Sequence, residues 1–127
     1  TPRGLGRLAD SPAVQSGVAL AEVRLGAARA YALEVLAETH ARAPTEGAIG
    51  IEDRARVRLA ASNAIQGAIE VADWVYKRAG VSAIFRDGPF QRQFRDIHTL
   101  SQQIQSRDAH FETIGQVLLG NPPDVFF

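Results

Sequence analysis

The sequence predicts an all-α fold, an up-and-down four-helix bundle made of two long helices and two shorter ones. Long stretches carry apolar residues at alternating spacings of three and four, the pattern of a helix with one buried face. Proline and glycine gather in the short segments between these stretches, and no segment alternates convincingly as a strand would. Because short connections favour antiparallel neighbours, we expect the helices to run up and down.

The first long helix is expected to reach about Arg42. Asp10 or Ser11 can cap its N-terminus, and Pro12 suits the first turn because the N–H that proline lacks has no partner there. Pro44 is expected to end it. The predicted inward face consists of Val14, Val18, Ala21, Leu25, Ala28, Ala32 and Val35.

The second long helix is expected to start near Ile51 and to stop at Gly80, after a loop over residues 43–50. Gly26 and Gly67 interrupt the two long helices at a cost of about 1 kcal/mol each relative to alanine. Close approach of the helices at these glycines and simple tolerance both remain open. The predicted inward face consists of Val57, Ala61, Ala64, Ala68, Val71 and Val75.

Two shorter helices follow a loop over residues 81–88. Pro89 is expected to start the third helix, and Gly120 to terminate the fourth, which begins at about Arg107. The predicted inward residues of the third helix are Phe90, Phe94, Ile97, Ser101 and Ile104, and those of the fourth are Phe111, Ile114 and Leu118.

Composition restricts the classes of function. The 127 residues suit a single domain, residues 1–127, and Lys plus Arg equals Asp plus Glu at 14 each, so charge favours neither nucleic acid nor an anionic membrane. No stretch approaches the ~20 apolar residues that span a bilayer, and the lack of cysteine fits a reducing cytoplasm. We therefore expect a soluble cytoplasmic protein. The lack of methionine hints at a segment of a longer protein.

The charged residues predict mainly surface pairs. An acid stands four residues before a base in Glu38/Arg42, Glu52/Arg56 and Asp73/Lys77. Each such pair on one helix contributes about 0.2–0.5 kcal/mol, so we expect solvent-exposed pairs that take no part in chemistry. The three histidines, His40, His98 and His110, lack metal-ligand spacing, so no metal site is expected.

Arg95 and Asp96 point about 100° apart on a helix and need separate partners. In one interpretation Arg95 caps a neighbouring helix and Asp96 pairs with a distant base, such as one of Arg54, Arg56 and Arg92. In the other, this end of the bundle approaches a cofactor. The turn from Gly80 to Ala83 would then offer backbone N–H groups at close range.

The order of features resembles the C-terminal helical domain of the acyl-CoA dehydrogenase superfamily, and most closely its flavin-dependent monooxygenase-like branch. The resemblance runs from LADSPAVQSGVALAEVRLGAARA through EDRARVRLAASNAIQGAIEVADWVYKRAG to PFQRQFRDIHTLSQQIQSRDAHFETIGQVLLGNPPD. The specific part is QRQFRDIHTLSQQ followed by a helix that terminates at LLG.

The resemblance implies an oxidoreductase in which this bundle is the C-terminal third, after a helical domain and a β domain. A flavin, FAD or FMN, would lie between the β domain and the bundle, and the bundle would make dimer or tetramer contacts. In the family the turn after the second long helix approaches the flavin, which implies a cofactor-binding role for Gly80, Val81, Ser82, Ala83 and Ile84.

The match departs from the family at two catalytic positions. Eight residues after the motif arginine, Arg95, the monooxygenase-like branch commonly has histidine near the reactive edge of the flavin, and this chain has Gln103. Many dehydrogenases carry a glutamate base at the next position, which is Ile104 here. Glutamine can donate a hydrogen bond to the flavin but cannot act as a general base near neutral pH, so the catalytic acid or base remains unknown.

The leading prediction is a monooxygenase-like flavoenzyme that acts on a small organic substrate. One alternative is an acyl-CoA dehydrogenase with a relocated base, and another is a non-catalytic helical oligomerisation bundle. The excised chain alone is expected to be inactive, because one helical domain cannot enclose a flavin.

Overall fold

The computed structural model describes residues 8–46, 49–79, 89–100, 102 and 109–123. In these ranges the regular elements are a short 3₁₀ helix η1 (Leu8–Asp10) and four α-helices: α1 (Pro12–Glu46), α2 (Ile51–Ala79), α4 (Pro89–Leu100) and α5 (Ala109–Leu118). The α-helices contain 35, 29, 12 and 10 residues. The all-α bundle of two long and two shorter helices is confirmed.

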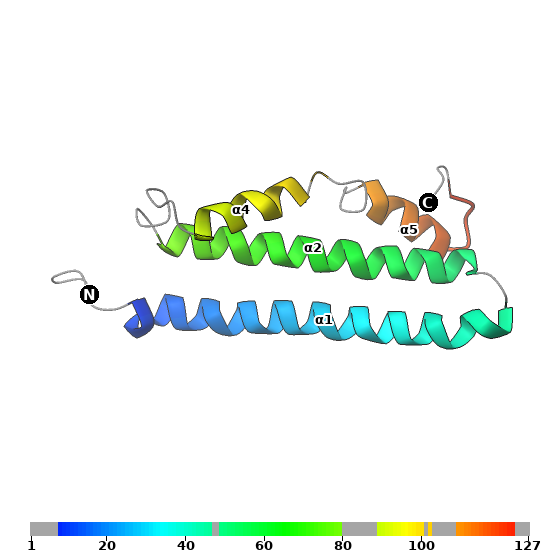
Figure 1. The fold of residues 1–127 in the computed structure, drawn as a ribbon, viewed down its shortest axis with the longest axis horizontal. Coiled ribbons are helices and arrows are strands. Elements are labelled where there is room, and N and C mark those ends of the chain that lie inside the picture. Colours follow the sequence, from blue (N-terminus) through cyan, green and yellow to red (C-terminus); the bar gives the residue numbers. More distant parts are fainter. Residues whose placement is uncertain (1–7, 47–48, 80–88, 101, 103–108, 124–127) are drawn as a thin grey trace.

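Helix α2 lies in the middle of the molecule. It packs along α1 on one side, while α4 and then α5 follow one another along its other side (Figure 1). As a result, Glu70 is the only exposed residue from Asp53 to Tyr76. The core between α2 and α5 is centred on Ala55, Ile114 and Val117, with Leu59 packed against them.

The helix ends follow from local sequence. Ser11, rather than Asp10, caps α1: its Oγ accepts a hydrogen bond from the N–H of Val14 at 3.4 Å. After α5, Gly120 adopts φ +82°, and the N–H of Asn121 donates to the carbonyl of Gln116 at 2.8 Å. This is the Schellman arrangement that a glycine favours, so the predicted stop at Gly120 is confirmed.

The predicted end of α1 at Pro44 is wrong, because the helix continues to Glu46. Pro44 lacks the backbone N–H that would donate to the carbonyl of His40. This loss falls in the last turn of the helix, where several carbonyls have no intrahelical donor in any case. A single lost hydrogen bond in the last turn is therefore not enough to stop the helix there.

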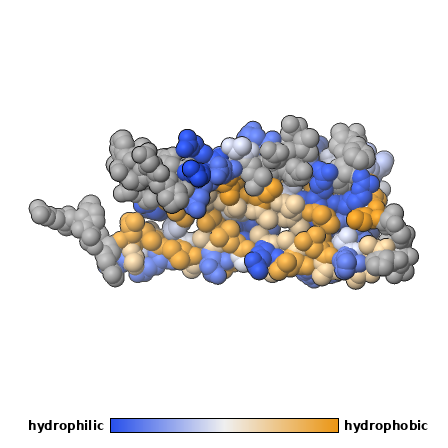
Figure 2. Space-filling model, in the orientation of Figure 1, coloured by the Kyte–Doolittle hydropathy of each residue, from blue (hydrophilic) through white to orange (hydrophobic). Residues whose placement is uncertain are grey.

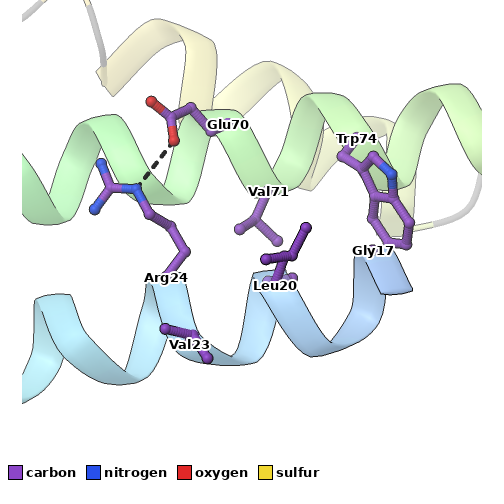
Figure 3. Close-up of a pocket in the computed structure, with 8 residues that line it drawn as sticks. Gly17, Leu20, Val23, Arg24, Glu70, Val71 and Trp74 are labelled. Atoms are coloured by element: carbon purple, nitrogen blue, oxygen red, sulfur yellow. Dashed lines mark hydrogen bonds and ion pairs between the residues drawn. The ribbon is translucent and has the colours of Figure 1, made fainter. Parts of the chain in front are cut away.

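The predicted inward face of α1 is partly wrong. Ala28 and Val35 are buried as expected, but the side chains of Val18 and Leu25 are 55% and 42% exposed. Their immediate neighbours in sequence, Gly17 and Arg24, face α2 instead (Figure 3). Helix α1 is apolar on more than one side, so hydropathy does not identify the side that packs on α2.

The other predicted faces agree better with the structure. The six predicted residues of α2 are all partly buried, as are Ile97 of α4 and Phe111 of α5. In α5 the prediction of Leu118 as inward is wrong: it is 55% exposed, while Val117 is buried beside Ile114. The side chains of Phe90 and Phe94, and residues Ser101 and Ile104, lie outside the described part of the structure.

Exposed apolar side chains occur around the part of α1 that α2 does not cover, and they appear as orange surface along that helix (Figure 2). The large exposed ones are Val18, Leu20, Val23, Leu25, Leu33 and Leu36. Isolated exposed apolar residues are normal, but six on one helix are more than scattered exposure accounts for.

Among the described helices, none combines the length and the apolar character that crossing a membrane requires.

Candidate functional site

An open groove lies between the N-terminal half of α1 and the C-terminal half of α2 (Figure 3). Its volume is about 430 Å³. The walls are mostly apolar, with one ion pair at one end. The lining residues are Gly17, Leu20, Ala21, Val23 and Arg24 of α1, and Glu70, Val71 and Trp74 of α2.

Trp74 closes one end of the groove by resting on Gly17. A Cβ added to Gly17 would lie 2.5 Å from Cε2 and 2.9 Å from Cη2 of the indole, so only glycine allows this contact. On the next turn of α2, the guanidinium carbon of Arg78 lies 6.0 Å from the centre of the indole ring, at the limit for a cation–π interaction. The ring is therefore held between α1 and a cation of its own helix.

Arg24 closes the other end of the groove. Its Nε donates to Glu70 Oε2 at 3.0 Å, and its Nη1 donates to Asn63 Oδ1 at 3.0 Å. The guanidinium lies over Gly67, where an added Cβ would come within 3.0 Å of Cζ. Among the described residues no atom lies within 4 Å of such a Cβ at Gly26. Gly67 thus lies under a close contact from the facing helix, whereas Gly26 faces open space among the described residues.

A second set of charges joins α1 to the start of α2. Arg42 makes a two-pronged contact with Asp53, through Nε to Oδ2 at 3.0 Å and through Nη2 to Oδ1, and Arg56 Nη1 donates to Glu38 Oε2 at 2.6 Å. These pairs connect two helices, so the predicted pairing within each helix, Glu38 with Arg42 and Glu52 with Arg56, is wrong. Tertiary packing brings better-placed partners than the i+4 position.

The ion pairs perturb the protonation of their members. Hydrogen bonding from Arg42 holds the pKa of Asp53 below its ordinary value of 3.8, against the opposing effect of burial. The hydrogen bond to Glu38 raises the pKa of Arg56. A recess of about 520 Å³ beside Asp53 is lined by the Arg42–Asp53 pair and by Arg56, which pairs with Glu38, and this suits a structural clamp better than a catalytic centre.

His98 connects α4 to α2. Its Nε2 lies 2.7 Å from Asp73 Oδ1, with both side chains about 40% exposed. Sequence spacing paired Asp73 with Lys77, and the structure gives it His98 instead.

The predicted cofactor contacts, Gly80 to Ile84 and Gln103, lie outside the described residues, so their roles remain predictions. The structure does describe the flanking helices: α2 ends at Ala79 and α4 begins at Pro89. Arg95 and Asp96 of α4 are both exposed. Of the bases proposed for Asp96, Arg56 contacts Glu38 instead.

In the described ranges, no cluster of three His, Cys, Asp or Glu side chains is placed to hold a metal ion.

Sequence reasoning missed the groove. Gly17 and Arg24 stood one position away from the residues chosen as inward, Val18 and Leu25, because apolar character decided that choice. The sequence did contain a signal for this face of α1. Gly17 and Arg24 are seven residues apart, a spacing that places both on one side of the helix.

Residues 3–107 match the family described as acyl-CoA dehydrogenase, C-terminal domain, and the chain belongs to this family. An indole-3-acetate monooxygenase from Pseudomonas putida is 27% identical over 120 residues, which is 94% of this chain and 31% of that relative. The chain therefore spans less than a third of the length of the relative. The family resemblance inferred from the sequence is confirmed, and the similarity to a monooxygenase is consistent with the suspected branch.

Proposed function

We propose that this chain is the C-terminal third of a flavin-dependent oxidoreductase of monooxygenase type that acts on a small organic substrate in the cytoplasm. The observation that carries the proposal is the family match over residues 3–107, together with similarity to a monooxygenase along 94% of the chain. Flavin, as FAD or FMN, supplies the redox chemistry when bound.

The bundle would form one wall of the flavin and substrate site through Gly80, Val81, Ser82, Ala83, Ile84 and Gln103. Support comes from the flanking helices: the end of α2 and the start of α4 lie at the same end of the molecule (Figure 1). A turn between two helix termini offers backbone N–H groups, which bind a heteroaromatic or anionic ligand without a charged side chain. Gln103 can donate a hydrogen bond there but cannot remove a proton.

Flavin reconstitution of the full-length protein tests the proposal. We expect binding of FAD or FMN and oxygen-dependent turnover of a small organic substrate. Failure to bind either flavin would contradict the assignment. Turnover of acyl-CoA with an artificial acceptor and without oxygen would replace it with the dehydrogenase alternative.

The same bundle would provide an interface for a dimer or tetramer. Val18, Leu25 and Leu36 are seven and eleven residues apart, close to two and three helical turns, so they form one line along the uncovered side of α1. Their side chains are 55%, 42% and 52% exposed. A second copy of this helix would bury that line, as closed assemblies commonly do with self-complementary surfaces.

Light scattering tests this interface. The double variant Leu25→Gln/Leu36→Gln should dissociate the assembly, because polar amides would replace apolar contacts. Leu119→Gln is a matched control, since Leu119 is 81% exposed but lies beyond α5. A wild-type monomer at high concentration, or an assembly unaffected by the double variant, would contradict the proposed interface.

A further inference from the structure

None of the described residues that line the groove between α1 and α2 takes part in the function proposed above. Its volume of about 430 Å³ falls in the range of ~300–1,000 Å³ that is usual for small-molecule sites. It also combines an apolar wall with a few polar groups, the Arg24–Glu70 ion pair, which is the usual composition of such sites.

The apolar part favours a flat ring. The floor is formed by Leu20 and Val71, and the indole of Trp74 stands at one end (Figure 3). Because the edge of the indole packs against Gly17, the ring is held in place before any ligand binds. A pre-positioned aromatic wall stacks on another aromatic ring at small entropic cost.

The polar part favours a carboxylate. Arg24 is fixed by its contact with Gly67 and by the hydrogen bond from Nη1 to Asn63. Its other partner, Glu70, is much freer, with a side chain that is 61% exposed against 31% for Arg24. A ligand carboxylate can therefore replace Glu70 at Arg24 Nε while Glu70 turns into solvent and Arg24 stays in place.

We propose that this groove binds a small aromatic carboxylate, with the ring between Trp74 and the Leu20–Val71 floor and the carboxylate on Arg24. Glu70 occupies the anion position in the free protein. Binding there does not depend on flavin, so the site can be tested separately from the function proposed above.

Titration calorimetry would measure the binding of 2-naphthoate, with neutral 2-naphthamide as the matched control. Trp74 is the only tryptophan of the chain, so its indole N–H gives a single NMR cross-peak that reports contact directly. We expect saturable one-to-one binding of 2-naphthoate with a shift of that peak. The neutral amide should bind about tenfold more weakly, because it lacks the charge-assisted hydrogen bond.

Three variants distinguish specific binding in this groove from non-specific binding to the apolar surface. Glu70→Gln should tighten 2-naphthoate binding several-fold by removing the resident anion, and Arg24→Gln should weaken it about tenfold. Leu33→Gln should leave it unchanged, since Leu33 is an exposed residue of α1 that does not line the groove.

The proposal is overturned if wild type and Glu70→Gln both show no saturable binding up to millimolar probe. It is equally overturned if acid and amide bind alike, or if Glu70→Gln weakens binding. If Arg24→Gln fails to fold, the Glu70 variant and the acid–amide comparison still decide the outcome, since Glu70→Gln keeps a side chain of the same size and leaves the contact of Arg24 with Asn63 in place.

Discussion

Gly17 of α1 lies directly against the indole ring of Trp74 of α2. The indole occupies the space that a Cβ at residue 17 would need, with Cε2 at 2.5 Å and Cη2 at 2.9 Å from that position. This contact sets the helix separation at one end of the bundle and positions the aromatic wall of the groove.

Gly17→Ala should destabilise the protein. The added methyl overpacks against a ring, at about 1–3 kcal/mol, and this outweighs the gain in helix propensity of about 1 kcal/mol. Gly26→Ala is the matched control on the same helix, because an added Cβ meets no described atom within 4 Å, so it should stabilise by about 0.5–1 kcal/mol. Urea unfolding followed by circular dichroism measures both, and two changes of the same sign would contradict the contact.

Gly120→Ala should destabilise by about 1 kcal/mol, because φ +82° is a left-handed conformation that an L side chain rarely adopts. Gly115→Ala, inside α5 with no described atom within 4 Å of an added Cβ, should be stabilising instead. Thermal unfolding of the pair measures the difference. Equal midpoints would show that the Schellman turn does not constrain the end of α5.

The Arg42–Asp53 pair predicts a pH dependence with a definite sign. The pKa of Asp53 is lowered in the folded protein, so its contribution to stability is present above the ordinary value of 3.8 and is lost as pH falls through the lowered folded value. Asp53→Asn should therefore reduce the free energy of unfolding at pH 7, with the difference from wild type shrinking in strong acid.

Glu52→Gln is the control for Asp53→Asn, since Glu52 is exposed in the same first turn of α2. Denaturant unfolding at several pH values would measure both variants. A difference between Asp53→Asn and wild type that persists unchanged at pH 2 would argue against the pairing.

The contact between His98 and Asp73 should hold α4 against α2 locally. Both side chains are about 40% exposed, so the loss in His98→Ala should be small, about 0.2–1 kcal/mol. Hydrogen exchange should nevertheless quicken in residues 89–100 and not in α5, which packs on α2 through a separate apolar cluster. Equal acceleration in both helices would indicate global rather than local loosening.

Local residue chemistry was sufficient to predict the helix class and most helix ends. Ser11 and Gly120 act on backbone groups within a turn of themselves, so their effects are visible in sequence. Pro44 was misjudged because a proline in the last turn removes a hydrogen bond without ending the helix. The family could likewise be recognised from the sequence, while the cofactor-binding roles of Gly80 to Ile84 and Gln103 remain predictions.

Tertiary structure alone decided which side of α1 is buried and which charges meet. Val18 and Leu25 were predicted inward because they are more apolar than Gly17 and Arg24. Packing reversed this choice, since an indole needs the empty space of a glycine and a guanidinium needs Asn63 and Glu70 on the facing helix. Spacing along one helix cannot encode partners on another, because those distances exist only after the chain has folded.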